Sequence, residues 1–271
     1  MGNTTTKIKS KKSHNLFIDR FTSYRELDNA LKKAGLGKLN LIIGISYTRS
    51  NAWNGSLPYY GEANLHSPHL VPNLYQQVIS IIGNTLSSFD ENKLIPAYGF
   101  GDSTTQDRAV FSFLKDDEGK DIACDTFLQV LDVYTTIINK IEQGNIKMSG
   151  PTSFVPIINK AIDMVQKTGK YHILLIICDG SVDERKQETI NAIVHASKFA
   201  LSIICIGLGQ GPFGVMEEFD DNIPDRNFDN FQFINFYKTM KKCKNQEVEF
   251  VKNCLMEIPD QYDYIKNNIL K

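Results

Sequence analysis

The chain has 271 residues, of which 42% are hydrophobic and 23% are charged, a composition that is ordinary for a globular protein with a sizeable core. Its net charge of -1 argues against a surface that attracts nucleic acid. No apolar run approaches the roughly 18 residues that a membrane-spanning helix requires, and the polar N-terminus does not resemble a secretory signal.

The first residues predict a flexible basic tail over 1–19 that carries a lipid. The opening residues M-G-N-T-T-T fit the M-G-x-x-x-[ST] pattern of N-myristoylation, with Gly2 as the acceptor once Met1 is removed. Four lysines follow before any acidic residue, at Lys7, Lys9, Lys11 and Lys12. A basic cluster is the second signal that a single acyl chain needs for stable membrane binding. A solvated tail that matches the pattern by chance is the alternative, with equal weight.

The first half of the chain predicts helices that alternate with short apolar strands. Ser23 and Glu26 form a capping-box pattern at the start of the first helix. The apolar run from Leu39 to Ile45 ends in a polar loop, which is typical of a buried parallel strand. In chain order we expect a helix over 23–35, a strand over 39–45, a polar loop over 50–68, a helix over 73–89 and strands over 95–100 and 110–113.

The second half continues this alternation and contains the strongest strand signal. The run from His172 to Cys178 is apolar at nearly every position, so we expect it to be buried on both faces. In chain order we expect helices over 126–141 and 154–166, a strand over 172–178, a helix over 184–199, strands over 202–207 and 231–236, and a helix over 246–256.

This alternation predicts an α/β domain over 20–265, built on a doubly wound, mostly parallel sheet with helices on both faces. A short C-terminal tail over 266–271 follows it. In such a sheet, ligands bind beyond the carboxyl ends of the strands, where the strand order changes direction. We therefore expect function in the loops that follow residues 45, 100, 150 and 178.

Those four loops are rich in hydroxyl and carboxylate side chains. Their sequences are S-Y-T-R-S-N at 46–51, G-D-S-T-T at 101–105, S-G-P-T-S at 149–153 and D-G-S at 179–181. Oxygen atoms that converge from several loops are suitable ligands for Mg²⁺, which prefers octahedral oxygen coordination and keeps several waters.

Several segments resemble, in the same order, the copine-type von Willebrand factor A domain, and most of all the version found in plant RING-type ubiquitin ligases. These segments lie at 44–51, 98–102, 149–154, 219–224, 228–233 and 256–259. The resemblance covers roughly residues 20–265. It implies a Rossmann-like von Willebrand factor A fold. It also implies a metal-ion-dependent adhesion site of the form D-x-[ST]-x-S, completed by a Thr and an Asp from later loops.

By position, the resemblance assigns Mg²⁺ or Mn²⁺ ligands to Thr48, Ser50, Thr152 and Asp179. Ser46 stands where the family has the first-loop Asp, so one negative charge is missing beside the cation. Two unit charges about 4 Å apart interact by roughly 4 kcal/mol at an effective dielectric constant of about 20. We therefore expect a degenerate site at Ser46, in which the metal is weakly bound or absent.

Two further residues in these loops have open alternatives. Asp102 either contributes charge next to the metal site or caps the turn that follows it. Trp53 is either an exposed anchor for a partner or a residue packed within its loop.

The chain does not predict an enzyme. Its five cysteines form no C-x-x-C pair, so they cannot build a RING or a zinc ribbon. Cys178 and Cys205 lie in apolar runs and are expected to be buried thiols, and the odd number and scatter of the five cysteines favour a reducing compartment. A Ser–His–Asp hydrolase built on the segment 101–103 would need a late His, and the last one is His195, inside a predicted helix.

We therefore expect a protein-binding module in which an acidic residue of a protein partner completes the metal site, without nucleic acid. Its basic tail would allow a membrane-associated signalling role. The alternative is a component of ubiquitin ligase activity whose RING comes from another chain. We expect a cytoplasmic location, with peripheral membrane association and the nucleus left open.

Overall fold

The computed structural model describes residues 24–33, 35, 39–55, 64–86, 94–180, 182–241 and 246–270. The predicted basic tail, with the Gly2 acceptor, lies outside the described residues, as does Cys243. The other four cysteines, at positions 124, 178, 205 and 254, are buried free thiols, as predicted for Cys178 and Cys205. None of the helices in the described ranges has the length and apolar character to cross a bilayer.

A six-stranded sheet forms the centre of the described structure, in the order β3-β2-β1-β6-β7-β8. Every neighbouring pair is parallel except β2 with the edge strand β3. The strands are β1 (Leu41–Ser46), β2 (Ala97–Phe100), β3 (Phe111–Ser112), β6 (His172–Cys178), β7 (Leu201–Gly207) and β8 (Phe231–Asn235). This arrangement confirms the predicted α/β class and the mostly parallel sheet.

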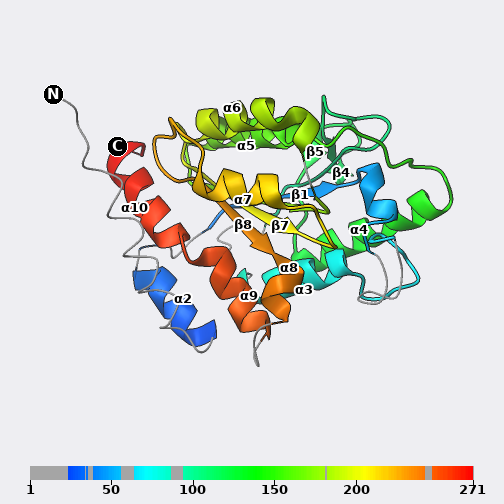
Figure 1. The fold of residues 1–271 in the computed structure, drawn as a ribbon, viewed down its shortest axis with the longest axis horizontal. Coiled ribbons are helices and arrows are strands. Elements are labelled where there is room, and N and C mark those ends of the chain that lie inside the picture. The colour runs from blue at the N-terminus through cyan, green and yellow to red at the C-terminus, as the bar shows by residue number, and fades with distance from the viewer. Residues whose placement is uncertain are drawn as a thin grey trace.

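The central strands are buried at every position, because helices cover both faces of the sheet. Figure 1 shows α5, α6 and α7 over one face and α3, α4, α8 and α9 over the other. The main helices are α3 (Leu74–Leu86), α4 (Phe127–Glu142), α5 (Val155–Thr168), α6 (Lys186–Ala196), α7 (Gly214–Asp221), α8 (Phe236–Met240) and α9 (Gln246–Leu255). The helices α2 (Tyr24–Lys33) and α10 (Ile258–Asn268) lie toward the end of the molecule at the left of Figure 1.

Several elements differ from the prediction. The expected strand over 110–113 is shortened to β3 at its centre, and a small hairpin that was not predicted follows it, in which β4 (Leu114–Lys115) pairs with β5 (Asp121–Ile122). The expected helix over 184–199 begins with a 3-10 turn at 183–185 before α6. Helices α7, α8 and α10 were not predicted, and the predicted domain end at residue 265 lies inside α10.

The strand order places the candidate loops together. From β1 the chain crosses through α3 to β2 on one side, whereas β6, β7 and β8 follow one another on the other side. The order therefore changes direction between β1 and β6, which pair in parallel from Leu41–Ile173 to Ile45–Ile177. Because both strands end at this edge, the residues that follow Ile45 and Ile177 are brought side by side.

Candidate functional site

Backbone hydrogen bonds join three of the four predicted loops at this edge of the sheet. The Arg49 amide donates to the Ser149 carbonyl at 2.6 Å, and the Ser149 amide donates to the Gly101 carbonyl at 3.0 Å. The Ser103 amide donates to the Lys147 carbonyl at 2.8 Å. The segment over 147–149 therefore lies between the loops that follow β1 and β2, and it holds them in a fixed arrangement.

The structure brings four of the predicted ligands into one group, which we call the oxygen cluster: Ser46, Thr48, Ser50 and Asp179. The Thr48 Oγ1 atom lies at its centre, 3.0 Å from Ser46 Oγ and 3.1 Å from Ser50 Oγ. The Thr48 hydroxyl also lies 3.2 Å from Asp179 Oδ1, to which it donates. Ser46, Thr48 and Asp179 are each at most 1% exposed, so the cluster forms the floor of the site.

Asp179 is the carboxylate of the oxygen cluster, and amide groups surround it. Asn51 Nδ2 donates to Asp179 Oδ1 at 3.1 Å, and Asn54 Nδ2 donates to Asp179 Oδ2 at 3.2 Å. Burial raises the pKa of Asp179, while hydrogen bonds from Ser50, Asn54 and Thr48 oppose that rise. A cation bound here would stabilise the ionised carboxylate and lower this pKa again.

The sequence reasoning missed Asn51 and Asn54. Asn51 is fully buried, and its Nδ2 also donates to the Thr48 carbonyl at 3.0 Å. Asn54 Nδ2 donates to the Asp179 carbonyl at 2.5 Å. Asn51 lies in the first-loop segment that resembles the family and Asn54 lies just after it, and this position is the signal in the sequence that could have identified them.

A groove of about 300 Å³ opens beside the oxygen cluster. Its lining residues come from the loop after β1, from the loop before α5, and from the segment after β6 that includes the 3-10 turn at 183–185: Thr48, Arg49, Ser50, Trp53, Ser149, Gly150, Pro151, Thr152, Val182 and Glu184. The predicted ligand Thr152 therefore shares a groove with Thr48 and Ser50. Within the described residues, its hydroxyl makes no hydrogen bond to the oxygen cluster.

Trp53 and Asp102 occupy different positions relative to this groove. Trp53 lines it and is 58% exposed, so its side chain is not packed within its loop. Asp102 is buried and accepts from the backbone amides of Thr104 at 3.2 Å and Thr105 at 3.0 Å, and from both of their hydroxyls. Of its two alternatives, the structure therefore places Asp102 as the cap of the turn.

The donor set of the oxygen cluster fits Mg²⁺ in chemistry and spacing. With Mg–O distances of about 2.1 Å, neighbouring ligands of an octahedron lie about 3.0 Å apart. The oxygen–oxygen distances of 3.0, 3.1 and 3.2 Å around Thr48 are those of its hydrogen bonds, and they are also close to this spacing. The charge is low, because Asp179 is the single carboxylate among the four residues of the cluster. Within the described ranges, no group of three His, Cys, Asp or Glu side chains is arranged to hold a metal. The cluster therefore offers mainly neutral hydroxyl ligands.

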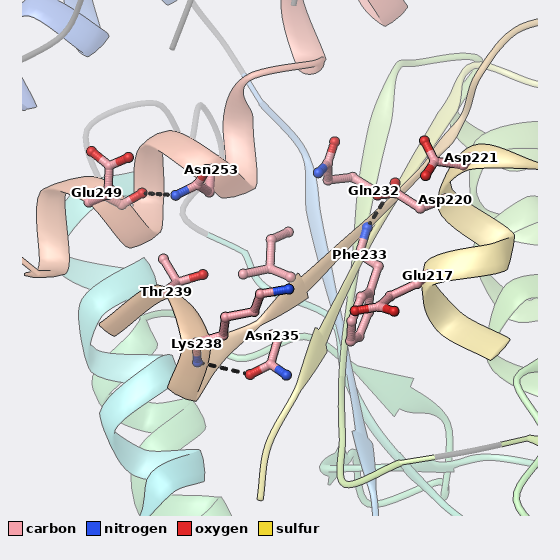
Figure 2. A pocket seen from close by; sticks show the side chains of 11 residues that line it. Glu217, Asp220, Asp221, Gln232, Phe233, Asn235, Lys238, Thr239, Glu249 and Asn253 are labelled. Atoms are coloured by element: carbon pink, nitrogen blue, oxygen red, sulfur yellow. Dashed lines mark hydrogen bonds between the residues drawn. The ribbon is translucent and has the colours of Figure 1, made fainter. Parts of the chain in front are cut away.

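A larger hollow of about 590 Å³ lies away from this edge, between α7, β8, α8 and α9 (Figure 2). Glu217, Asp221 and Glu249 line it together with Lys238. In Figure 2 the partly buried Asp220 accepts a hydrogen bond from the Phe233 amide. Size alone does not make this hollow the functional site, because the hydroxyl groups with ligand spacing lie elsewhere.

Comparisons with known proteins identify the family of the chain. The family model described as Copine matches residues 64–271. The chain is 46% identical over 267 residues to the E3 ubiquitin-protein ligase RGLG5 of Arabidopsis thaliana, covering 93% of this chain and 59% of that protein. It is also 46% identical over 251 residues to Copine family protein 2 of Caenorhabditis elegans, covering 92% of this chain and 3% of that protein. A solved structure, the SpRpn10 VWA domain, aligns with a TM-score of 0.48 at 11% identity, covering 73% of this chain and 87% of that one.

The chain spans between 51% and 59% of the length of RGLG5, RGLG2 and RGLG1, the plant ligases that head these comparisons. Another plant relative, the E3 ubiquitin-protein ligase RGLG3, is 42% identical, and the chain covers 68% of its length.

Proposed function

Because this chain belongs to the copine family, we propose that it is a protein-binding module whose ligand site is the oxygen cluster and the groove beside it. The observation that carries the proposal is the ligand-like spacing around Thr48, at the edge of the sheet where ligands bind in this class of fold. The partly exposed groove gives a partner access to this buried cluster.

We propose that Mg²⁺ or Mn²⁺ binds weakly to this cluster, held by Ser46, Thr48, Ser50, Asp179 and Thr152. The ion would supply a positive charge that attracts a carboxylate of the partner. Thr48, Ser50 and Asp179 are already within hydrogen-bond distance of one another or of a shared neighbour, so they need little rearrangement to coordinate an ion. The partner's Asp or Glu would then take an open coordination position.

Trp53 is the proposed anchor for the remainder of the partner segment. Its side chain lines the groove and is 58% exposed. A large aromatic side chain next to a polar ligand site gives apolar contact area at low entropic cost, as at many binding hot spots. We therefore expect a partner segment in which an acidic residue lies close to an apolar one.

A phage-displayed library of random peptides, selected on the protein in the presence of Mg²⁺, tests this function. We expect enriched peptides that carry an acidic residue and that lose affinity in EDTA, with Ser50→Ala and with Trp53→Ala. Leu128→Ala is the matched control, because Leu128 is 72% exposed but lies on α4 and does not line the groove. Selected peptides that bind the Ser50 and Trp53 variants as well as the unaltered protein would contradict the proposal.

A contribution to protein ubiquitination is the second candidate, and the printed names of the plant relatives favour it. In this case the chain would bind a substrate or a ligase, and a RING protein would supply the transfer activity. Purified ubiquitylation components with and without this chain provide the test. We expect no transfer from this chain alone, and transfer without an added RING protein would show instead that the chain is itself an enzyme.

A further inference from the structure

Four aromatic rings lie in contact beneath the loop that carries the oxygen cluster. The His66 ring is stacked on Tyr47 at 4.9 Å between centroids and on Tyr75 at 4.1 Å. Tyr134 completes the group, 5.8 Å from His66 and 5.9 Å from Tyr75. All four side chains are at most 1% exposed. A histidine and three tyrosines in one buried layer carry five polar side-chain atoms. All of them have a hydrogen-bond partner except the Tyr47 hydroxyl, which has none among the described residues.

Hydrogen bonds of His66 connect this layer to the first loop. His66 Nε2 lies 2.9 Å from the carbonyl oxygen of Ser46, and His66 Nδ1 lies 2.9 Å from the Tyr134 hydroxyl. A carbonyl oxygen can only accept, so Nε2 carries the proton and donates. Burial lowers the pKa of His66 to about 3, so the ring is neutral at ordinary pH. In the neutral ring Nδ1 then accepts from Tyr134, which fixes the tautomer.

Tyr75 provides a second connection, through Asn51. The Tyr75 hydroxyl donates to Asn51 Oδ1 at 2.7 Å, which turns the Nδ2 group of Asn51 toward the oxygen cluster. That Nδ2 group then donates to Asp179 Oδ1 and, at 3.3 Å, to Thr48 Oγ1. The Tyr75 hydroxyl also lies 3.3 Å from the Ser46 carbonyl. The orientation of Asn51 is therefore set by the ring layer and not by the loop alone.

We propose that His66 and Tyr75 are positioning residues for the oxygen cluster. His66 holds the peptide of Ser46, and Tyr75 holds the Asn51 amide that orients Thr48 and Asp179. This inference rests on the proposed function, since it names the groups that set the geometry of that same site. Removal of a residue that hydrogen-bonds to a metal ligand and orients it commonly lowers metal affinity by 10-fold to 100-fold.

Paired variants separate positioning from a general loss of stability. His66→Phe keeps a ring in the stack but removes both nitrogens, while His66→Gln keeps an amide donor that can reach the Ser46 carbonyl. Tyr75→Phe removes only the hydroxyl. Tyr171→Phe is its matched control, because Tyr171 is also buried and its hydroxyl makes a 2.8 Å hydrogen bond to Ser202 Oγ, away from the first loop.

Two readouts are measured beside the melting temperature. The first is the Mg²⁺ dissociation constant from titration calorimetry. The second is amide hydrogen exchange over residues 47–54, where the Asn51 and Trp53 amides donate to Thr48 and Ser50 carbonyls at 3.1 Å. We expect His66→Phe and Tyr75→Phe to weaken Mg²⁺ binding roughly 10-fold or more and to speed exchange in this loop. His66→Gln should restore both, and Tyr171→Phe should lower only the melting temperature.

The outcomes distinguish this inference from the proposed function. If the unaltered protein binds no Mg²⁺, the metal part of the proposed function fails, and loop exchange alone decides the role of His66 and Tyr75. Exchange and Mg²⁺ affinity that stay unchanged in both variants, with the same loss of melting temperature as Tyr171→Phe, would overturn the inference and leave the rings as ordinary core.

Discussion

At the scale of single residues, Ser46 determines the charge of the oxygen cluster. Its side chain lies 3.0 Å from the central Thr48 Oγ1, so a carboxylate at this position would lie beside the same ion as Asp179. A second negative charge at about 4 Å contributes up to roughly 4 kcal/mol at an effective dielectric constant of about 20. We therefore expect the low charge of the cluster, rather than the spacing of its hydroxyls, to limit its affinity for a metal ion.

Ser46→Asp is expected to tighten Mg²⁺ binding by tenfold or more, since about 1.4 kcal/mol, a part of that Coulomb energy, is a factor of ten. Titration calorimetry with the two proteins measures the change. Thr136→Asp is the control, because it adds the same charge at an exposed position on α4. Micromolar Mg²⁺ affinity in the unaltered protein, or no gain in the variant, would refute the role given to Ser46.

Asp220 makes stability depend on pH. Burial raises its pKa to about 8, helped by Glu257, Asp229 and Asp221, although the hydrogen bond from the Phe233 amide opposes the rise (Figure 2). An unfolded Asp titrates near 3.9, so between about pH 4 and pH 8 the folded state holds a proton that the unfolded state has lost. The contribution of Asp220 to stability is therefore complete at low pH and falls as the pH rises through this window.

Asp220→Asn should remove this dependence, because the amide cannot ionise and its oxygen still accepts from Phe233. In urea titrations, the stability of the variant relative to the unaltered protein should rise between pH 5 and pH 8, by up to about 1.4 kcal/mol for each pH unit. Asp132→Asn removes an exposed carboxylate on α4 and controls for net charge. Parallel pH curves for Asp220→Asn and the unaltered protein would mean that Asp220 is ionised in the folded state.

At the scale of elements, the contact between β1 and α5 leaves no space at Gly44. A Cβ atom built there would lie 2.7 Å from Ile157 Cγ1 and 3.2 Å from Ile157 Cδ1. Gly44 is also opposite Tyr98 and Ile176 in the middle of the sheet, so the strand cannot move aside without disturbing both neighbours. Close packing of α5 on β1 brings the Thr152 loop, which precedes α5, to the oxygen cluster.

Gly44→Ala should lower the free energy of unfolding by about 1–3 kcal/mol, the usual cost of overpacking a core. Urea denaturation measures this change. Gly214→Ala is the matched control, because it lies at the start of α7 with no atom within 4 Å of the added Cβ. It should be neutral or stabilise by up to about 1 kcal/mol through helix propensity. Equal effects of the two substitutions would contradict tight packing at Gly44.

The burial and the length of each element explain which elements the sequence could predict. Strands such as β6 (His172–Cys178) were predicted with correct bounds because they are buried on both faces and read as continuous apolar runs. Helix α8 has 5 residues and α7 has 8, too few for a periodic pattern to stand out. The hairpin strands β4 and β5 have 2 residues each, and they pair only because the surrounding chain brings them together.

In the candidate site, too, some residues could be predicted from the sequence and others could not. The loops that contain Thr48, Ser50 and Asp179 could be located because they follow buried strands, and the topology of the sheet places strand ends together. The choice of these residues within the loops came from the family resemblance. His66 and Tyr75 could not, because their roles depend on hydrogen bonds to residues 20 and 24 positions away in the chain. A lone buried His in a loop or a Tyr in a helix has no local pattern that shows which groups it will meet.

At the scale of the whole molecule, the sheet brings the candidate loops to one edge. The predicted membrane association concerns a different part of the chain, the basic tail with its acceptor Gly2. Gly2 and the four lysines at positions 7, 9, 11 and 12 lie before the first described helix. A myristoyl chain alone gives a binding constant of about 10⁴ M⁻¹, which is marginal. Each lysine near an anionic surface adds about 1 kcal/mol, so four lysines make the difference between transient and stable association.

Gly2→Ala, expressed together with an N-myristoyltransferase, tests this arrangement by sedimentation with vesicles. The unaltered protein should bind vesicles that contain anionic lipid more tightly than neutral ones, and added salt should weaken this preference as it screens the lysines. Gly2→Ala should lose most binding to both, whereas replacing the four lysines by Gln should lose only the preference for anionic lipid. If Gly2→Ala sediments as the unaltered protein does, no acyl chain takes part. Any membrane association would then have to arise from the lysines alone, and high salt should abolish it.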